Sequence, residues 1–417
     1  MERTPRQVQR VYLTLSLFNT MAASLIWGIN TLFLLDAGLT STEAFAANAF
    51  FTVGQVLFEV PTGVVADTWG RRMSYLTGAI TLSIATALYL LAWYLRAPFW
   101  AWAVTSIFLG LGFTFFSGAT EAWLIDALTS TGYDGKFETV LARGKVVEGT
   151  AMLTGSVAGG LIAQVSNLGV PYVVRAGFLL VTFTVAYKFM RDWGFTAVRG
   201  RKPLEEVRQV LKASIDHGLR NRPVRWIMLA APFTMGVGIY GFYAMQPYAL
   251  ELYGSSTAYT IAGLSAALVA GAQIIGGLLV PFAGRLFQRR TSILLVSLVA
   301  SVIAIAVIGL AHNFALAVAA LAVWALVLFA SAPIRSAYLN KLIPSAQRAT
   351  VLSFDNLMAS SGGVVLQPAL GRVADASGYA ASYLVCSAVQ VLALPFTWLS
   401  RRENQPADQI ERDDPTK

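Results

Sequence analysis

Long apolar stretches alternate with short polar segments along almost the whole chain. There are twelve of these stretches, each about 20 residues or longer, and about 20 residues of α-helix cross the roughly 30 Å hydrocarbon core of a bilayer. Because lipid offers the backbone no hydrogen-bond partners, the stretches should be helices. The predicted spans are residues 11–35, 43–66, 73–95, 98–127, 145–167, 171–190, 226–250, 257–283, 291–311, 314–337, 350–373 and 380–400. The pattern therefore predicts an all-α integral membrane protein with twelve transmembrane helices.

The composition agrees with a membrane protein and excludes several other classes. Of the 417 residues, 56% are hydrophobic and 13% are charged, whereas a typical soluble domain has about 25% charged residues. The net charge of +9 comes from short basic clusters between the apolar stretches, so no nucleic-acid partner is expected. Cys386 is the single cysteine, and His217 and His312 are far apart in the sequence. We therefore expect no disulfide, no metal site and no enzymatic activity.

The positions of the basic residues predict the orientation. If the N-terminus is cytoplasmic, all 31 Lys and Arg residues fall on the inner side except Arg96, Arg175 and Arg372. Segments rich in Lys and Arg stay in the cytoplasm during insertion. The first apolar stretch, 11–35, is too long for the core of a signal peptide and is interpreted as a span. We expect a multi-pass protein of the cell (inner or plasma) membrane with both termini cytoplasmic.

A long polar segment divides the predicted spans into two sets of six. The expected organisation is an N-terminal six-helix bundle (1–190), a cytoplasmic linker (191–225), a C-terminal six-helix bundle (226–400) and a cytoplasmic tail (401–417). Five apolar residues of the linker recur at helical spacing, which predicts an amphipathic helix on the membrane surface. They are Leu204, Val207, Val210, Leu211 and Ile215.

The most specific motif lies at the cytoplasmic end of the second predicted span. It reads Gly63-Val64-Val65-Ala66-Asp67-Thr68-Trp69-Gly70-Arg71-Arg72. This matches the Gly-x-x-x-Asp-x-x-Gly-Arg-Arg pattern of the major facilitator superfamily, and the chain as a whole resembles a transporter of that superfamily. Related spacings from Gly371 to Gly378 and from Gly277 to Arg285 indicate internal duplication. The resemblance implies two pseudo-symmetric six-helix bundles that work by alternating access.

The resemblance also implies a cytoplasmic gate. In many members of the superfamily the loop aspartate, the following arginine and an acidic residue of the fourth span form a charge relay that latches the outward-facing state. The matching residues here are Asp67, Arg71 and Asp126. Asp67 is also expected to interact with the start of the eleventh helix. The complete predicted gate consists of Glu59, Gly63, Asp67, Gly70, Arg71, Arg72, Asp126 and Asp355.

Acidic residues inside the bilayer are the candidates for transport chemistry, because a charge there costs roughly 2.5–3.5 kcal/mol on insertion scales. Glu59, Glu121, Asp126 and Glu148 stand out. Glu121 is the preferred substrate or proton site, since the fourth span lines the cavity in this fold, with structural pairing as the alternative. The other predicted lining residues are Asn19, Trp27, Asn30, Tyr240, Tyr243, Gln246, Tyr248, Trp324 and Arg335. A carboxylate among aromatic rings would suit an amphipathic cation, although packing alone would also explain the aromatics.

Within the superfamily the chain most resembles bacterial efflux-type, drug/proton antiporter-like permeases. The segment Gly155 to Gly160 in the fifth span keeps the glycines of a motif common there but lacks its proline. The expected function is export of small amphipathic compounds by proton antiport, and the alternative is import of a nutrient or metabolite by a symporter or facilitator. A signalling or lipid-handling protein without solute transport is a third interpretation.

The energy source and partners follow from these expectations. The chain has no Gly-x-x-x-x-Gly-Lys-Ser/Thr sequence, so we expect no bound ATP or other cofactor and a proton gradient as the driving force. The expected partners are a small-molecule substrate and the lipid bilayer, and we expect a monomer. Two basic residues receive structural interpretations: Arg335 as a residue that snorkels to the membrane surface, and Lys145 as the surface partner of Glu148.

Overall fold

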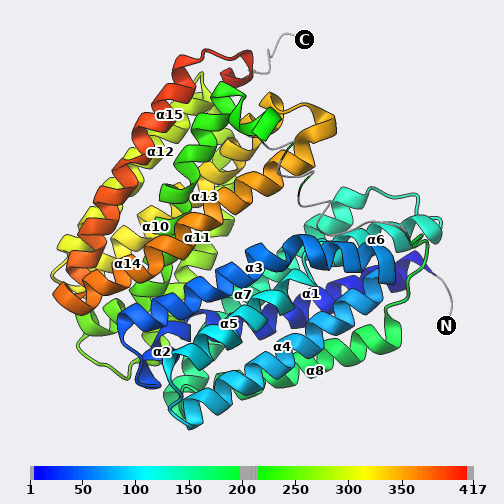
Figure 1. Ribbon diagram of the computed structural model, residues 1–417, viewed down its shortest axis with the longest axis horizontal. Coiled ribbons are helices and arrows are strands. Elements are labelled where there is room, and N and C mark those ends of the chain that lie inside the picture. The colour runs from blue at the N-terminus through cyan, green and yellow to red at the C-terminus, as the bar shows by residue number, and fades with distance from the viewer. Residues whose placement is uncertain (1–3, 198–207, 209–211, 213–214, 411–417) are drawn as a thin grey trace. The chain divides into compact units, whose positions relative to one another are not determined.

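The computed structural model describes residues 4–197, 208, 212 and 215–410 (Figure 1). The regular elements of these residues are helices, apart from one isolated bridge between Arg289 and Gln409. Contacts divide the chain into two compact units, residues 1–206 with 255–267 and residues 207–254 with 268–417. The predicted amphipathic helix of the linker lies mostly outside the described residues. Ile215 is described, and it begins a short π-helix that ends at Leu219.

The first unit is built from eight helices that correspond to the first six predicted spans. They are α1 (Pro5–Trp27), α2 (Asn30–Asp36), α3 (Ser41–Trp69), α4 (Arg71–Tyr94), α5 (Phe99–Thr114), α6 (Ala119–Ser130), α7 (Phe137–Val165) and α8 (Val170–Phe189). Helix α1 packs on α7 and α8, α3 packs on α5, and α4 packs on α5 and α8. Figure 1 shows these helices, in blue to green, lying side by side as a bundle.

The second unit repeats this arrangement. Its helices are α10 (Arg222–Tyr253), most of α11 (Tyr259–Leu286), α12 (Arg290–Leu310), α13 (Phe314–Leu342), α14 (Arg348–Val391) and α15 (Ala393–Arg402). Helix α10 packs on α14 and α15, while α12 packs on α13, α14 and α15. Within each unit, therefore, the first span contacts the fifth and sixth, and the third contacts the fourth and sixth. This repetition of internal contacts agrees with the duplication that the sequence indicates.

The number of spans depends on how the bends are counted. Among the described residues, ten helices are long and apolar enough to cross a membrane, or eleven if α1 and α2, which meet at 49°, form one span. One of the ten, Thr350–Arg402, is interrupted at Gly378, whose φ of 84° and ψ of 167° are not helical. Counting the arms on either side of Gly378 separately gives the twelve spans that the sequence predicts.

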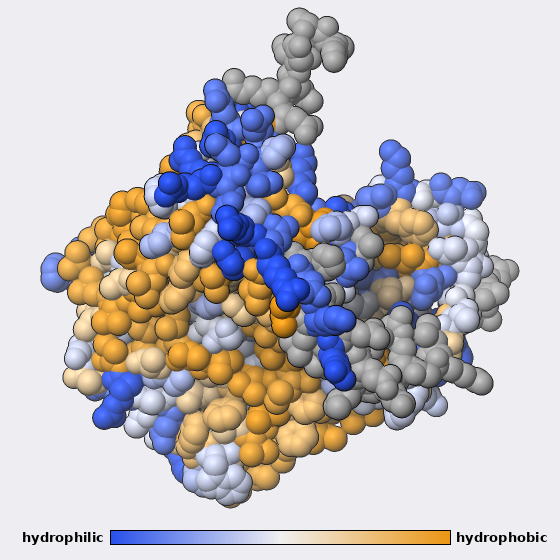
Figure 2. Space-filling model, turned by 45° about the horizontal axis from the view of Figure 1, so that its top comes forward, coloured by the Kyte–Doolittle hydropathy of each residue, from blue (hydrophilic) through white to orange (hydrophobic). Residues whose placement is uncertain are grey.

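Apolar side chains on the outside of the helices identify the surfaces that face lipid. On α4, Ile80, Ile84, Leu88 and Leu91 are exposed, and their spacing of three or four residues places them on one face of the helix. Exposed Val296, Val299 and Ile303 form a similar stripe on α12. Figure 2 shows hydrophobic residues covering broad, continuous areas of the face in view. Patches of this kind are rare on monomeric soluble proteins, so the solvent for these surfaces is lipid.

A carboxylate that follows the last predicted span of each unit caps the third span of the same unit. In the first unit, the backbone N–H of Arg72, near the start of α4, donates to Asp192 Oδ1 over 2.9 Å. In the second unit, the backbone N–H of Thr291, near the start of α12, donates to Asp408 Oδ1 over 2.7 Å. The first N–H groups of a helix have no partner within the helix, and a carboxylate there is also favoured by the helix dipole. In both units, therefore, a segment outside the predicted membrane spans is hydrogen-bonded to the start of the third span.

Candidate functional site

The fourth span of the first unit is broken where the sequence predicts a continuous helix. Helix α5 ends at Thr114 and α6 begins at Ala119, and between them Gly118 has a φ of +67°, a conformation that favours glycine. The Oγ of Ser117 donates to Glu59 Oε1 of α3 over 2.6 Å. Glu59, a predicted gate residue, therefore contacts the break from the second span. The Ser117-Gly118 pair is a turn signal in the sequence.

A cavity of about 200 Å³ opens beside this break, inside the first unit. Four helices and the break contribute to its wall, and most of the lining residues carry a hydroxyl, amide or carboxylate group. They are Tyr12, Leu15, Ser16, Asn19, Thr20, Tyr75, Phe116, Ser117, Gly118, Thr120, Glu121 and Glu148. Because α6 starts anew after the break, Glu121 lies in its first turn, where the helix dipole stabilises a negative charge.

Two carboxylates of the cavity share one ammonium group. Lys145 Nζ lies 3.1 Å from Glu148 Oε2 and 3.5 Å from Glu121 Oε1. The Glu121 side chain is 52% exposed and that of Lys145 is 64% exposed, so both can be reached from outside the protein. The expected pairing of Lys145 with Glu148 is present, and it extends to Glu121 of the fourth span. The three side chains together carry one excess negative charge.

Tyr75 contributes a buried polar group to the same cavity. The residue is 1% exposed, and its ring packs edge to face on Phe116 with the centroids 4.5 Å apart. Within the described part of the chain its hydroxyl has no hydrogen-bond partner. A buried hydroxyl without a partner costs free energy.

The gate motif forms an ion-pair cluster at the start of α4. Arg71 Nη1 lies 2.6 Å from Oδ1 of Asp67, which is four residues earlier in the sequence and near the end of α3. Arg71 Nε lies 4.0 Å from Asp126 Oδ2. The three residues of the predicted relay are thus neighbours, with the Asp67 pair close and the Asp126 pair long. Gly70 between α3 and α4 has a φ of +102°, and a Cβ there would collide with the Asp192 carboxylate. This position therefore requires glycine.

A short segment after α8 joins the motif to the fourth span, which the sequence did not reveal. Asp192 caps α4, and the Trp123 indole donates from Nε1 to the Arg191 carbonyl oxygen over 2.7 Å. Gly194 has a φ of +75°, and a Cβ there would lie 2.6 Å from the Asp126 carbonyl oxygen. The segment thus fixes the end of α6, where Asp126 lies, relative to Arg71 and Arg72.

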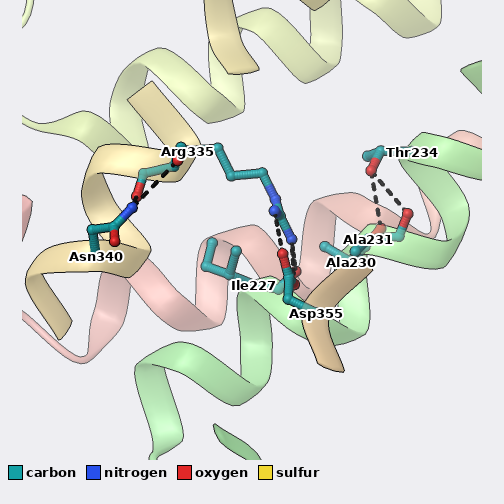
Figure 3. Close-up of polar contacts among 8 residues, drawn as sticks. Ile227, Ala230, Ala231, Thr234, Arg335, Asn340 and Asp355 are labelled. Carbon is teal, nitrogen blue, oxygen red and sulfur yellow. Dashed lines mark hydrogen bonds and ion pairs between the residues drawn. The ribbon is translucent and has the colours of Figure 1, made fainter. Parts of the chain in front are cut away.

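Gly63 and Asp355 are two further predicted gate residues, one in each unit. A Cβ at Gly63 would meet no described atom within 4 Å, so Gly63 makes no close helix contact within its own unit. Asp355 belongs to the second unit, where its carboxylate receives two hydrogen bonds of 2.6 and 2.7 Å from the guanidinium of Arg335. Figure 3 shows the Arg335 side chain extended towards Asp355 with the guanidinium facing the carboxylate. Arg335 is therefore a partner in a nearly buried ion pair, which its interpretation as a snorkelling residue did not include.

The remaining predicted substrate residues do not line the cavity of the first unit. Asn30, at the start of α2, donates to Asn48 and accepts from the Tyr172 hydroxyl, both over 2.8 Å. Tyr240 is fully buried in the second unit and donates to Ser382 Oγ over 2.6 Å. Gln246 is 2% exposed, Tyr243 packs against the Phe242 ring, and Trp27 is the last residue of α1. Their role in binding substrate stays a prediction.

Arg175 has an environment that the charge count did not anticipate. It was counted among the basic residues on the outer side of the membrane, and it is 2% exposed within α8. Its Nε donates to Thr86 Oγ1 over 3.1 Å and its Nη1 to the Ala22 carbonyl oxygen over 3.2 Å. Arg175 therefore connects the first, third and sixth spans of its bundle. Its position within two turns of the start of a span concealed this role in the sequence.

This arrangement defines an integral membrane protein made of two helical bundles with a polar cavity inside one of them. Solved structures with the same fold include the nucleoside transporter NupG, with a TM-score of 0.76 and 12% identity over 94% of this chain and 98% of that chain. A bacterial homologue of the human lysosomal transporter Spinster, inward-facing and unoccupied, has a TM-score of 0.73 and 15% identity over 97% and 98% of the two chains. A D-xylose-proton symporter has a TM-score of 0.67 and 15% identity over 94% and 96%.

The chain belongs to the Major Facilitator Superfamily. The sequence profile of that superfamily matches residues 12–365 and 266–417, and these two matches together extend from the first span to the end of the chain. No curated protein has a significantly similar sequence. Family and fold together indicate a transporter that works by alternating access rather than an enzyme.

Proposed function

We propose that this protein exports small amphipathic compounds in exchange for protons. The observation that carries the proposal is the place of Glu121, a partly exposed carboxylate in a polar cavity inside the first bundle. A carboxylate in this position can hold a proton or pair with a positively charged group, but not both at once. If Glu121 holds either the proton or the substrate but never both, binding of one requires release of the other. This exclusion couples movement of the substrate in one direction to movement of the proton in the other.

The proposed orientation places both termini in the cytoplasm of a cell that carries the protein in its inner or plasma membrane. The proposal is supported by the distribution of basic residues and the positive-inside rule. In this orientation the Asp67, Arg71 and Asp126 cluster is a cytoplasmic latch. The proton gradient drives transport without a bound cofactor, and a monomer is the transporting species.

The test of this function compares proton-dependent efflux in cells that express equal amounts of wild type, Glu121→Gln or Glu138→Gln. Glu138 is a matched control because it lies on the exposed first turn of α7, outside the cavity. We expect Glu121→Gln to lose efflux driven by a pH gradient and Glu138→Gln to keep it. Equal gradient-dependent efflux by both variants would refute the role of Glu121 as the proton site.

Import is the second candidate function, because solved structures of this fold include a nucleoside transporter and a D-xylose-proton symporter. A hydroxyl-rich cavity wall is compatible with such polar solutes. Counterflow in proteoliposomes with a collapsed proton gradient separates the two mechanisms. A facilitator still equilibrates its substrate under these conditions, because its transport needs no proton gradient.

A further inference from the structure

The cavity of the first unit has a charge and a size that restrict its ligand. Glu121 and Glu148 face a single ammonium group, Lys145, so the site has one negative charge more than it has positive charges. Its volume of about 200 Å³ is below the roughly 300–1,000 Å³ of pockets that enclose drug-sized ligands. The complementary molecule is therefore small and positively charged, or it is the cationic end of a longer one.

A ligand can displace the Lys145 ammonium from its place beside Glu121. Its side chain is 64% exposed, and a lysine ammonium on a flexible four-carbon stem can leave one partner for another at little steric cost. Its distance to Glu121, 3.5 Å, is longer than that of a charge-assisted hydrogen bond, which is about 2.7–2.9 Å. Glu121 is therefore incompletely neutralised, and a ligand ammonium can make a shorter contact with it.

Tyr75 supplies an independent sign of a ligand. Its hydroxyl is buried and has no hydrogen-bond partner among the described residues, yet the residue lines the same cavity as Glu121. The charges of Glu121 and Glu148 can be balanced by ammonium groups, so the Tyr75 hydroxyl is not needed to neutralise them. A polar group of the ligand, separate from its ammonium, would satisfy it.

We propose that this cavity binds a small organic ammonium ion that carries a second hydrogen-bonding group. The ammonium replaces Lys145 between Glu121 and Glu148, and the second polar group meets the Tyr75 hydroxyl. Asn19 and Ser16 on α1 provide further polar wall. This assignment rests on the proposed transport function, because it names the chemical class of the substrate at the Glu121 site.

The test is calorimetric titration of the purified full-length protein with three probes of nearly equal size. Tyramine has both an ammonium and a hydroxyl, phenethylamine has the ammonium alone, and 4-ethylphenol has the hydroxyl alone. We expect tyramine to bind most tightly and 4-ethylphenol at least tenfold more weakly. Glu121→Gln should weaken tyramine binding at least tenfold, while Glu138→Gln should leave it unchanged. Tyr75→Phe should abolish the preference for tyramine over phenethylamine.

Lys145→Met provides a test in the opposite direction. Removing the competing ammonium should tighten the binding of both amines several-fold, and a gain in affinity cannot arise from a misfolded variant. The inference is overturned if neither amine binds wild type, if 4-ethylphenol binds as tightly as tyramine, or if Lys145→Met weakens amine binding. Failure of proton-dependent efflux with this binding pattern intact would instead overturn the proposed transport function alone.

Discussion

Asp408, the last residue of a short 3-10 helix that follows α15, accepts hydrogen bonds from both the backbone N–H and the hydroxyl of Thr291 at the start of α12, each over 2.7 Å. Arg290 strengthens the same junction by donating to the Ala407 carbonyl oxygen over 2.7 Å. The segment that follows the twelfth predicted span is thus an integral part of the second bundle. Residues 401–417 were predicted as a cytoplasmic tail, and Asp408 within this segment caps α12.

The cap predicts a loss of stability when the carboxylate is removed. We expect Asp408→Ala to lower the free energy of unfolding by about 0.5–2 kcal/mol, the usual cost of deleting a capping side chain. Asp134→Ala is the control, because Asp134 lies exposed in the loop after α6. Thermal unfolding of the purified proteins measures both. Equal melting temperatures for the two variants would show that the cap does not stabilise the bundle.

Asp192 predicts a pH dependence of stability. Burial raises the pKa of this carboxyl above 3.8, against the opposing effect of Arg72 and Arg71. The folded protein therefore binds the proton more tightly than the unfolded chain does, so the contribution of Asp192 to the free energy of unfolding falls as pH rises from about 3.8 through the raised pKa. Asp192→Asn keeps an oxygen for the Arg72 N–H but cannot ionise. We expect the stability of wild type relative to this variant to decrease with rising pH in that window and then level off. A constant or increasing difference would contradict the assignment.

The Arg335 and Asp355 pair predicts coupled mutational effects. The Asp355 side chain is 4% exposed and that of Arg335 is 29% exposed, so Asp355→Leu leaves a largely buried guanidinium without its partner. Removing one member of a buried pair costs about 3–5 kcal/mol, and the partial exposure of Arg335 places the expected loss near the lower end. The double variant Arg335→Met with Asp355→Leu should recover part of that loss. If the losses in the free energy of unfolding caused by the two single substitutions simply add in the double variant, the two side chains are not energetically coupled.

Arg175 predicts a distinction between arginine and lysine. Its guanidinium reaches Thr86 and the Ala22 carbonyl oxygen from one planar group, a geometry that a lysine ammonium cannot reproduce. We expect both Arg175→Met and Arg175→Lys to lower the melting temperature. Arg143→Met, an exposed position on α7, should not. A wild-type melting temperature for Arg175→Lys would mean that charge alone is required.

The latch predicts a change in conformational population. Asp67→Asn removes the negative charge that lies 2.6 Å from the Arg71 guanidinium, and we expect this to favour the inward-facing state. Spin-label distances between the end of α3 near Trp69 and the start of α14 near Arg348 measure the shift, with Asp134→Asn as the control. Identical distance distributions in Asp67→Asn and wild type would rule out the latch.

Much of the fold was predictable because it depends on local chemistry. The spans follow from runs of apolar residues that only a helix can carry across lipid. The contact of Asp67 with Arg71 follows from their closeness in the motif, where only the turn at Gly70 separates the end of α3 from the start of α4. The motif from Gly63 to Arg72 identified the superfamily, because its glycine, acidic and basic positions occur together at fixed spacing.

The cavity was predictable in a few residues and not as a whole. Glu121 and Glu148 were singled out because a carboxylate in a span is costly, and Asn19 was expected in the lining from its place in the first span. Tyr75, Ser16 and Lys145 come from other helices, and nothing in their own surroundings in the sequence relates them to Glu121. The break at Gly118 was missed, although Ser117-Gly118 is a turn signal, because the flanking stretch is apolar enough to be interpreted as one uninterrupted span.

The sequence by itself determined the class of protein, the approximate spans and the family, since hydropathy and a contiguous motif are properties of neighbouring residues. The tertiary structure alone decided that Asp192 caps α4 and Asp408 caps α12, that Arg335 pairs with Asp355, and that Arg175 is buried. Asp192 and Asp408 are separated from the N–H groups they cap by 120 and 117 residues. Such pairings depend on how whole helices pack, and hydropathy, which treats each residue by its own polarity, carries no information about them.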